Sequence, residues 1–407
     1  MKKFLALCLS VIMAGSLVAC GAKDDSSANG DSKGPAQKKD VTLKVWGAQE
    51  EQELLKKLCD EFKAASTNVN YTIEFGVCSE ADAKTKILED TAAAADVFAF
   101  ANDQLYDLVN AGALYEITKN KDAIVAANMQ SVVDSASKDG SLYAYPMTAD
   151  NGYFLYYDKS VISPEQAGSF ETMLDAADAA GKKVVMDVSN GWYIASFFLG
   201  AGGKLAIGED GKQTCDFNNE AGVGAGEGIK AITSHAAYMT GDDDVIKGGF
   251  GNSVVAAVSG AWNAKDIKEI LGENYAAAKL PTFKVNGKDT QMGSFFGSKL
   301  VGVSAETKNP VEAMALAEYI TNEKAQEARF AARGLGPSNK VVADSDVVKA
   351  DLALKALADQ SAFATSQNAV LGTYWGPAEA FGVAMETKDY SKSVKELLDA
   401  MVEQITK

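Results

Sequence analysis

The sequence predicts an α/β fold built from two units. In its first part, short apolar strands alternate with amphipathic helices, an order typical of a parallel sheet covered by helices. The pattern starts again near residue 153, and a chain of 407 residues is longer than the roughly 150 residues expected for one domain. Charged residues make up 23% and hydrophobic residues 47% of the chain, a globular composition. We therefore expect two α/β units, each with its own core.

The first unit begins with a strand in which Val41, Leu43 and Val45 alternate with polar residues. An acidic helix start follows at Glu50 and Glu51, with apolar residues at helical spacing behind it. The run 96–101 is short and apolar, which favours a buried parallel strand. The elements that we expect here are strands at 41–45, 71–75 and 96–101 and helices at 50–62, 83–95 and 103–111, the last ending at Gly112.

The second unit follows the aromatic run 153–157. It comprises a helix from Ser169 to Gly181, a strand at 184–186, a helix at 192–199 and a buried strand at 253–258. The C-terminal third reads as mostly helical, with candidates at 310–321, 323–332, 347–358, 374–385 and 391–405.

The N-terminus has the pattern of a secretory leader. Lys2 and Lys3 precede an apolar run from Phe4 to Met13, which is too short to span a membrane, and small residues follow. Residues 17–20, Leu-Val-Ala-Cys, resemble a bacterial lipobox, which predicts a signal peptide over 1–19 and a lipid-modified Cys20. An ordinary signal peptide with an accidental cysteine is the alternative. Residues 20–40 then form the lipidated cysteine and a disordered tether, because they contain no large apolar side chain.

The charge of the chain limits its partners. The net charge is −16, and removing Lys2 and Lys3 with the leader leaves 37 basic against 55 acidic residues, or −18. Such a polyanion repels nucleic acid and anionic lipid. His235 is the single histidine and stands near no nucleophile motif, so we expect no histidine-based metal site, no catalytic triad and no cofactor.

Three further patterns carry little functional signal. The glycines at 222, 224, 226 and 228 do not have the spacing of a dinucleotide loop, and the run Asp242–Asp244 lacks the glutamate of a calcium loop and reads as a solvated acidic turn. Cys59 and Cys78 are compatible with a disulfide or with two buried free thiols, and sequence spacing leaves both open; Cys215 is unpaired in either case.

The positive signal is aromatic. The tryptophans at 46, 192, 262 and 375 all stand near the ends of predicted elements, where α/β sheets place ligand crevices. Three of them lie beside turn-forming or polar residues: Trp192, Trp262 and Trp375. Aromatic faces suit the C–H face of a sugar ring, while carboxylates and amides bond its hydroxyls. This pattern favours a neutral polyol as ligand.

Six sequence blocks occur in an order and at a spacing that match a known family: Val41–Trp46, Ala95–Asp103, Gly112–Thr118, Tyr143–Pro146, Leu280–Lys284 and Tyr374–Trp375. Through these blocks the chain resembles the bacterial maltose/maltodextrin-binding proteins of ABC importers, over nearly all of residues 41–407. The resemblance implies a two-lobe periplasmic-binding-protein-like fold, with each lobe a mostly parallel sheet flanked by helices and several chain crossings as the hinge. Lobe one is then expected at 41–149 with 298–345, and lobe two at 150–297 with 346–407. It also implies that sugar binds between the lobes, which close on it.

By motif matching, the resemblance implies a set of ligand-binding residues. Polar contacts fall on Glu50, Glu51, Asp103 and either Asp150 or Asn151, and an aromatic contact falls on Phe100. The three stacking positions fall on Trp192, Trp262 and Trp375. Gln104 stands where well-known members have an arginine, and Glu51 stands at a lysine position, so the polar subsites differ from theirs.

The implied protein is a monomeric, non-enzymatic binder at the outer face of the cytoplasmic membrane, held there by its lipid anchor. Its partners are a malto-oligosaccharide ligand and the permease subunits of an ABC importer, with no nucleic acid. Three alternatives stay open: a binder of another oligosaccharide such as xylo-oligosaccharide, a sugar-sensing lipoprotein, and a glycoside hydrolase, which requires a pair of carboxylates flanking the bond.

Overall fold

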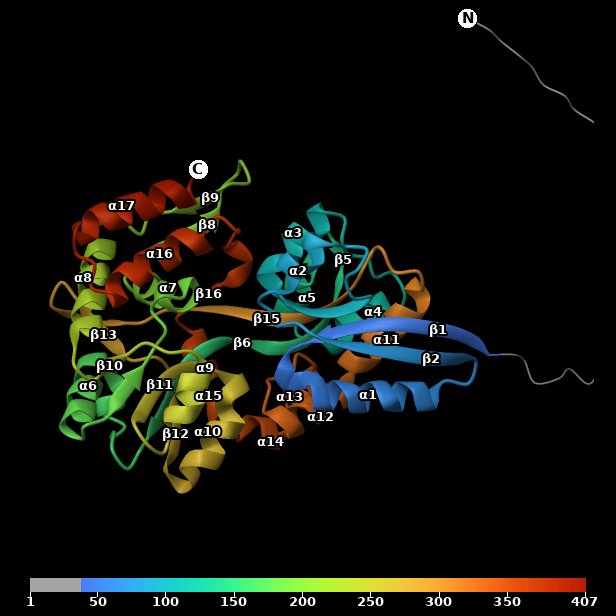
Figure 1. Cartoon of the computed structure of the whole chain (residues 1–407), viewed down its shortest axis with the longest axis horizontal. Coiled ribbons are helices and arrows are strands. Elements are labelled where there is room, and N and C mark those ends of the chain that lie inside the picture. Colours follow the sequence, from blue (N-terminus) through green and yellow to red (C-terminus); the bar gives the residue numbers. More distant parts are fainter. Residues whose placement is uncertain (1–37) are drawn as a thin grey trace, which may run out of the picture.

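The protein is a two-lobe α/β molecule, as the computed structural model of residues 38–407 describes it. The predicted signal peptide, Cys20 and most of the predicted tether lie outside the described residues, and the first strand already begins at Lys39. Figure 1 shows the two lobes side by side, with strands β6 (Ala144–Asp158) and β15 (Ser294–Val303) running between them. The predicted α/β class and two-lobe architecture are confirmed.

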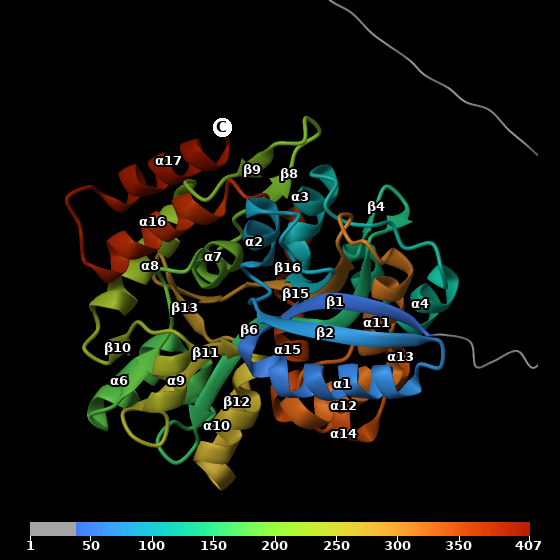
Figure 2. The same cartoon turned by 45° about the vertical axis from the view of Figure 1, so that its right-hand side comes forward.

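Lobe one begins with the expected alternation of strands and helices. Its elements are β1 (Lys39–Gly47), the 3-10 turn η1 (Gln49–Glu51), α1 (Gln52–Ala65), β2 (Val69–Val77), α2 (Ala83–Glu89), β3 (Val97–Ala101), η2 (Asn102–Gln104), α3 (Leu105–Asn110), α4 (Lys121–Ala127), α5 (Gln130–Ser135), β4 (Ser137–Lys138) and β5 (Ser141–Leu142). The chain returns to this lobe with α11 (Pro310–Thr321) and α12 (Glu323–Arg333). Both views show α1 beside the β1–β2 pair (Figure 2).

Lobe two holds the second α/β unit and the C-terminal helices. Its elements are η3 (Gln166–Gly168), α6 (Phe170–Ala179), β7 (Lys183–Val185), α7 (Gly191–Gly200), β8 (Leu205–Ile207), β9 (Gln213–Cys215), α8 (Glu220–Ser234), β10 (Tyr238–Met239), α9 (Asp243–Gly249), β11 (Val254–Gly260), η4 (Ala261–Asn263), α10 (Ala264–Leu271), η5 (Gly272–Asn274), β12 (Tyr275–Ala278), β13 (Thr282–Val285) and β14 (Lys288–Gln291). After α13 (Lys340–Ala343) and α14 (Asp346–Lys349), the chain closes the fold with α15 (Leu352–Ser361), β16 (Ala364–Ser366), η6 (Gln367–Ala369), α16 (Trp375–Glu386) and α17 (Val394–Ile405).

One mixed sheet runs through both lobes in the order β10-β7-β11-β6-β15-β3-β1-β2. The outer pairs β1–β2, β1–β3, β7–β10 and β7–β11 are parallel, as expected for β-α-β units. β6 and β15 are antiparallel to each other, and each also pairs antiparallel with its neighbour β11 or β3. The sheet is therefore less parallel than the sequence predicts, because its central strands are the chain crossings themselves.

The buried apolar residues form separate cores in the two lobes. One cluster combines residues from 41–147 with residues from 300–325. A second combines residues from 153–295 with residues from 370–405, and a third, on α9, α10 and α15, covers the other face of lobe two. The detailed lobe boundaries expected from the sequence stay a prediction.

Cys59 and Cys78 are both buried free thiols in lobe one, so of the two alternatives for this pair the structure has the unpaired one. Burial raises the pKa of the Cys59 thiol to about 12 and also raises that of Cys78. Within residues 38–407, no helix combines the length and the apolar character that crossing a bilayer requires.

Candidate functional site

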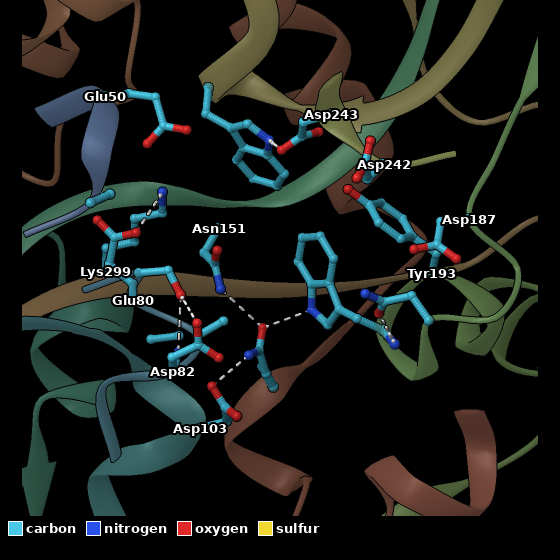
Figure 3. Close-up of a pocket in the computed structure, with 18 of the residues that line it drawn as sticks. Glu50, Glu80, Asp82, Asp103, Asn151, Asp187, Tyr193, Asp242, Asp243 and Lys299 are labelled. Carbon is cyan, nitrogen blue, oxygen red and sulfur yellow. Dashed lines mark hydrogen bonds and ion pairs between the residues drawn. The ribbon is translucent and has the colours of Figure 1, made fainter. Parts of the chain in front are cut away.

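A cavity of about 590 Å³ lies at the junction of the two lobes. Segments of both lobes and of the crossing strands line it, and Figure 3 shows their polar side chains facing one another. One part of the wall comes from lobe one and the crossing strands, through residues in 48–51, 79–82 and 101–104 together with Asn151 and Lys299. The rest comes from later segments of the chain: residues in 187–193 and 241–246, and Val258, Trp262, Arg333, Leu335, Gln367, Trp375 and Glu379.

Strand ends position most of the wall. Glu50 follows the carboxyl end of β1, Asp103 follows that of β3, and Trp262 follows that of β11. This is the edge at which α/β sheets bind their ligands, because the chain leaves each strand there and presents loop side chains. The sequence folds this way because each buried strand is followed at once by polar or turn-forming residues.

Four aromatic residues form what we call the aromatic wall: Trp192, Tyr193, Trp262 and Trp375. Trp192 lies in the first turn of α7, where the Asn190 side chain accepts a hydrogen bond from the Trp192 amide at 2.9 Å. The ring centroids of Trp192 and Trp262 are 5.9 Å apart, with an interplanar angle of 35°. All of these rings are partly exposed, so they present apolar faces to the cavity.

The polar wall of lobe one includes a buried ion cluster. The Glu51 carboxylate accepts from Arg329 Nε at 2.7 Å and lies 3.7 Å from Arg333 Nη1. Gln104 does not face a ligand freely either, because its amide donates to the carbonyls of Glu80 and Ala81 and its oxygen accepts from the Lys84 amide. Both residues shape the wall, and of the lobe-one residues expected at the site they leave Glu50 and Asp103 as carboxylate acceptors.

Lys299, on the crossing strand β15, connects the two walls. Its ammonium lies 3.7 Å from Glu80 of lobe one and 5.2 Å from the ring centre of Trp262 in lobe two. A cation at this distance from an aromatic ring is attracted by the π face. The side chain is only 11% exposed, so both contacts act with little solvent screening.

The cavity is strongly acidic. Among its described lining residues, nine carry carboxylates and two carry cationic groups, and both cations are paired with carboxylates of the lining. Burial raises the pKa of Asp103 to about 6. Burial also raises the pKa of Asp187 and of Glu379, and the Asp187 charge raises that of Glu379 further.

The structure brings together seven of the residues expected at the site: Glu50, Glu51, Asp103, Asn151, Trp192, Trp262 and Trp375. Of the two alternatives Asp150 and Asn151, only Asn151 lines the cavity. Asp150 is 1% exposed and accepts from the Gly336 amide at 2.6 Å, which directs it into the protein.

Phe100, expected from the sequence to contact the ligand, lies instead in the core of lobe one and outside the cavity lining. Every residue of β3 is buried, and the Phe100 ring, with 0% exposure, packs in the lobe-one core 5.7 Å from Phe98. Phe100 is enclosed by the core of lobe one, and within β3 only Ala101, at the carboxyl end of the strand, lines the cavity.

Several lining residues were not predicted from the sequence, notably Glu80, Asp187, Lys299 and Gln367. They stand in segments without a motif. Asp243 is different, because the sequence predicts a solvated acidic turn for the run 242–244. In the structure Asp242 and Asp243 line the cavity, although Asp242 is also exposed, and Asp244 lies outside the lining with its side chain 91% exposed.

Comparison with known proteins places the chain among binding proteins. Residues 57–356 match the family model of the bacterial extracellular solute-binding proteins. A solved structure determined with acarbose is 32% identical, with a TM-score of 0.81, and the match covers 90% of this chain and 99% of that one. The unliganded maltodextrin-binding protein of L. casei BL23 is 26% identical, with a TM-score of 0.74 and the same coverage. The galactooligosaccharide-binding protein of Bacillus subtilis (strain 168) is 26% identical over 99% of this chain and 96% of its own length.

Proposed function

The chain belongs to the family of bacterial extracellular solute-binding proteins, and from this premise we propose that it captures malto-oligosaccharides between its lobes and delivers them to an ABC importer. The observation that carries the ligand class is the aromatic wall opposite a row of carboxylates. Sugar rings stack their C–H faces on indoles, and carboxylates accept hydrogen bonds from the hydroxyls at the ring edge.

The two lobes supply different kinds of contact to a ligand, which explains how a bound ligand would favour closure of the lobes. Trp192, Trp262 and Trp375 come from lobe two, while Glu50 and Asp103 come from lobe one. A sugar that stacks on one wall and bonds the other gains both sets of contacts only when the lobes approach each other. Its binding free energy therefore favours the closed state.

Galacto-oligosaccharides are the second candidate ligand. The observation that favours them is the likeness of the whole chain to the galactooligosaccharide-binding protein of Bacillus subtilis. The 32% identity to a structure determined with acarbose supports the first candidate instead. Galactose and glucose differ in the orientation of the C4 hydroxyl, and their oligomers can also differ in linkage, so we expect hydrogen bonds to the cavity carboxylates to favour one of them.

Titration calorimetry with a panel of trisaccharides tests the proposal. We expect heat of binding with maltotriose and weaker or absent binding with xylotriose and cellotriose, and a galactosyl trisaccharide is the direct competitor. Tighter binding of the galactosyl or xylosyl sugar would show that this sugar, rather than a malto-oligosaccharide, is the ligand, and the proposed role as a binding protein would stand. Cleavage of any panel sugar on prolonged incubation would instead indicate a hydrolase.

We also propose that Cys20 anchors the protein to the outer face of the membrane, with residues 21–37 as the tether. Each CH₂ group of an acyl chain that is buried in the bilayer contributes roughly 0.8 kcal/mol of binding free energy, so two acyl chains on Cys20 hold the protein stably at the membrane. Cys20→Ser is expected to move the protein from the membrane fraction to the medium without a change in sugar affinity. Retention of this variant on membranes would contradict the anchor.

Delivery to a permease is tested in cells. Deletion of the gene is expected to abolish uptake of labelled maltotriose, and the Cys20→Ser variant to restore it only in part. Normal uptake in the deletion strain, with loss of a transcriptional response to the sugar, would favour the sugar-sensing alternative.

A further inference from the structure

The side chain of Gln367 links three residues of the cavity that belong to different parts of the fold. Gln367 lies on η6 and is 3% exposed. Its Oε1 accepts from Trp192 Nε1 at 3.0 Å and from Asn151 Nδ2 at 3.2 Å. Its Nε2 donates to Asp103 Oδ1 at 2.6 Å. Figure 3 shows these bonds as dashed lines between Asn151, the indole and Asp103.

The orientation of the Gln367 amide follows from one of these partners. An indole N–H is a donor and never an acceptor, so the atom facing Trp192 must be the amide oxygen. The amide nitrogen then faces Asp103, where it needs an acceptor. Asp103 Oδ1 is therefore held as an acceptor of the Gln367 N–H.

This leaves the other Asp103 oxygen for a ligand. Oδ2 accepts no hydrogen bond from another residue within the described part of the chain, and Asp103 lines the cavity. Because Oδ1 already accepts from Gln367, we expect a proton that binds Asp103 to bind Oδ2. Protonation converts the ligand-facing oxygen from an acceptor into a donor.

We propose that Gln367 is a positioning residue that fixes Asp103 Oδ2 as the ligand-facing acceptor and holds the edge of Trp192 in register with it. This inference rests on the proposed function, because it assumes a sugar hydroxyl as the partner of Oδ2. In this structure the nearly buried amide bonds a hydrogen-bonding group of lobe one and a stacking ring of lobe two at the same time.

The surroundings of Asp103 are compatible with titration near neutral pH. Lys84 of α2 and Asp107 of α3 face it and are themselves paired at 2.7 Å, and Glu80 and Asp82 approach from the preceding loop. Burial raises the pKa of Asp103, and the hydrogen bond from Gln367 counters that increase. Wild-type affinity for maltotriose is thus expected to fall several-fold as the pH decreases from 8 to 5.

Gln367→Glu reverses the sign of this dependence. Two carboxylates this close cannot both ionise easily, so they share a proton at low and neutral pH, and the pair then has the single negative charge of the wild-type amide–carboxylate pair. At pH 8.5 the proton is lost and the two groups repel each other. Affinity is expected to fall at least tenfold at high pH, where the wild type binds best.

The exchanged pair Gln367→Glu with Asp103→Asn is the decisive variant. The new amide at position 103 can donate to the new carboxylate at position 367 and present its own oxygen to the ligand. That carboxylate still accepts from Trp192 and Asn151. Affinity is expected to return to within about threefold of wild type and to lose its pH dependence between 5 and 8.5. Gln367→Met, which has a similar length, removes all three hydrogen bonds and is expected to bind weakly at every pH.

The readouts are calorimetric affinity for maltotriose and the indole N–H resonance of Trp192, assigned with Trp192→Phe in the full chain. The chemical shift of this resonance is expected to change in Gln367→Met and to return to its wild-type value in the exchanged pair. The proposal is overturned if Gln367→Glu has the wild-type pH profile, or if the exchanged pair binds as weakly as Gln367→Glu at pH 8.5. A wild type that binds no maltotriose rejects the proposed function instead, and the Trp192 resonance then still decides whether Gln367 holds the indole.

Discussion

Trp262 and Asp243 are joined by a hydrogen bond of 2.8 Å from the indole Nε1 to Oδ2 of the carboxylate. The other carboxylate oxygen accepts from Asn263 and Ser259, so Asp243 is itself fixed. The ring lies against Gly260, where an added Cβ would come within 2.0 Å of it. Trp262 is thus oriented by contacts on its edge and its face before any ligand arrives.

The first prediction concerns this orientation. Asp243→Ala releases the edge of Trp262 and is expected to weaken maltotriose binding about tenfold, since a hydrogen bond to a charged group contributes roughly 1.5–3 kcal/mol. Calorimetry measures the affinity, and a melting curve checks the fold. Asp244→Ala is the matched control, because Asp244 is the exposed neighbour paired only with Lys247 at 3.6 Å. Equal affinities of the two variants would show that Trp262 needs no such support.

The second prediction concerns the stacking rings. Changing Trp192, Trp262 or Trp375 to Ala is expected to cost about 1–3 kcal/mol of binding free energy, by analogy with base stacking on aromatic side chains. Trp46→Ala is the control, since Trp46 lies outside the cavity lining and packs against lobe one beside Gly76. It should lower the melting temperature and leave sugar affinity close to normal. If folded variants at all three ring positions bind maltotriose with unchanged affinity, these rings are not the stacking residues of the site.

The third prediction follows from the charge of the cavity. Because its carboxylates outnumber its cations and both cations are already paired, an anionic ligand meets repulsion. A maltotriose analogue with one ring oxidised to a carboxylate is expected to bind at least tenfold more weakly than maltotriose at low ionic strength. The difference should narrow in salt and in Glu50→Gln, whereas maltotriose itself should be insensitive to salt. A salt-independent difference would point to a steric cause.

The fourth prediction uses the pKa of Asp103, which burial raises from 3.8 to about 6. Between these values the folded protein binds more protons than the unfolded chain, so the contribution of Asp103 to stability decreases as the pH rises through this window. The shift corresponds to at most about 3 kcal/mol, and the partial exposure of the residue reduces this. Asp103→Asn keeps the oxygen that accepts from Gln367. It is expected to be more stable than the ligand-free wild type above pH 7 and to lose this advantage near pH 4, as urea unfolding at several pH values can measure.

Local signals predicted the helices whose ends are chemically marked. The helix expected at 310–321 is α11 without change, because Pro310 starts it and Asn322 ends it. The single helix expected at 347–358 is two, α14 and α15, since the Asp351 side chain accepts from the Leu354 amide and starts a new helix. The helix expected at 83–95 ends at Glu89, because the backbone of Asp90 leaves the helical conformation (φ −153°, ψ 89°) and its side chain accepts from the Ala93 amide.

Elements that depend on distant partners could not be predicted in this way. The glycine-rich stretch 220–234 has poor helix propensity, yet it forms α8. Its glycines are explained by close packing: a Cβ on Gly222 would lie 1.9 Å from the Phe217 carbonyl oxygen, and one on Gly226 would lie 2.4 Å from Val394. The same limit applies to the site. The aromatic positions are marked by their neighbours in sequence, whereas Gln367 and Lys299 reach the cavity only through the return of the chain between the lobes.

The two crossing strands also bear on how the protein unfolds. Residues 144–152 of β6 pair with β15 beside lobe one, and residues 153–158 of the same strand pair with β11 and β12 in lobe two. If the lobes folded as independent units, each would lose the hydrogen bonds between β6 and its partner strands, and backbone N–H and C=O groups in its core would be left without partners. Neither half of the chain is then an autonomous domain, and the molecule should melt in one cooperative transition in spite of its bilobed shape.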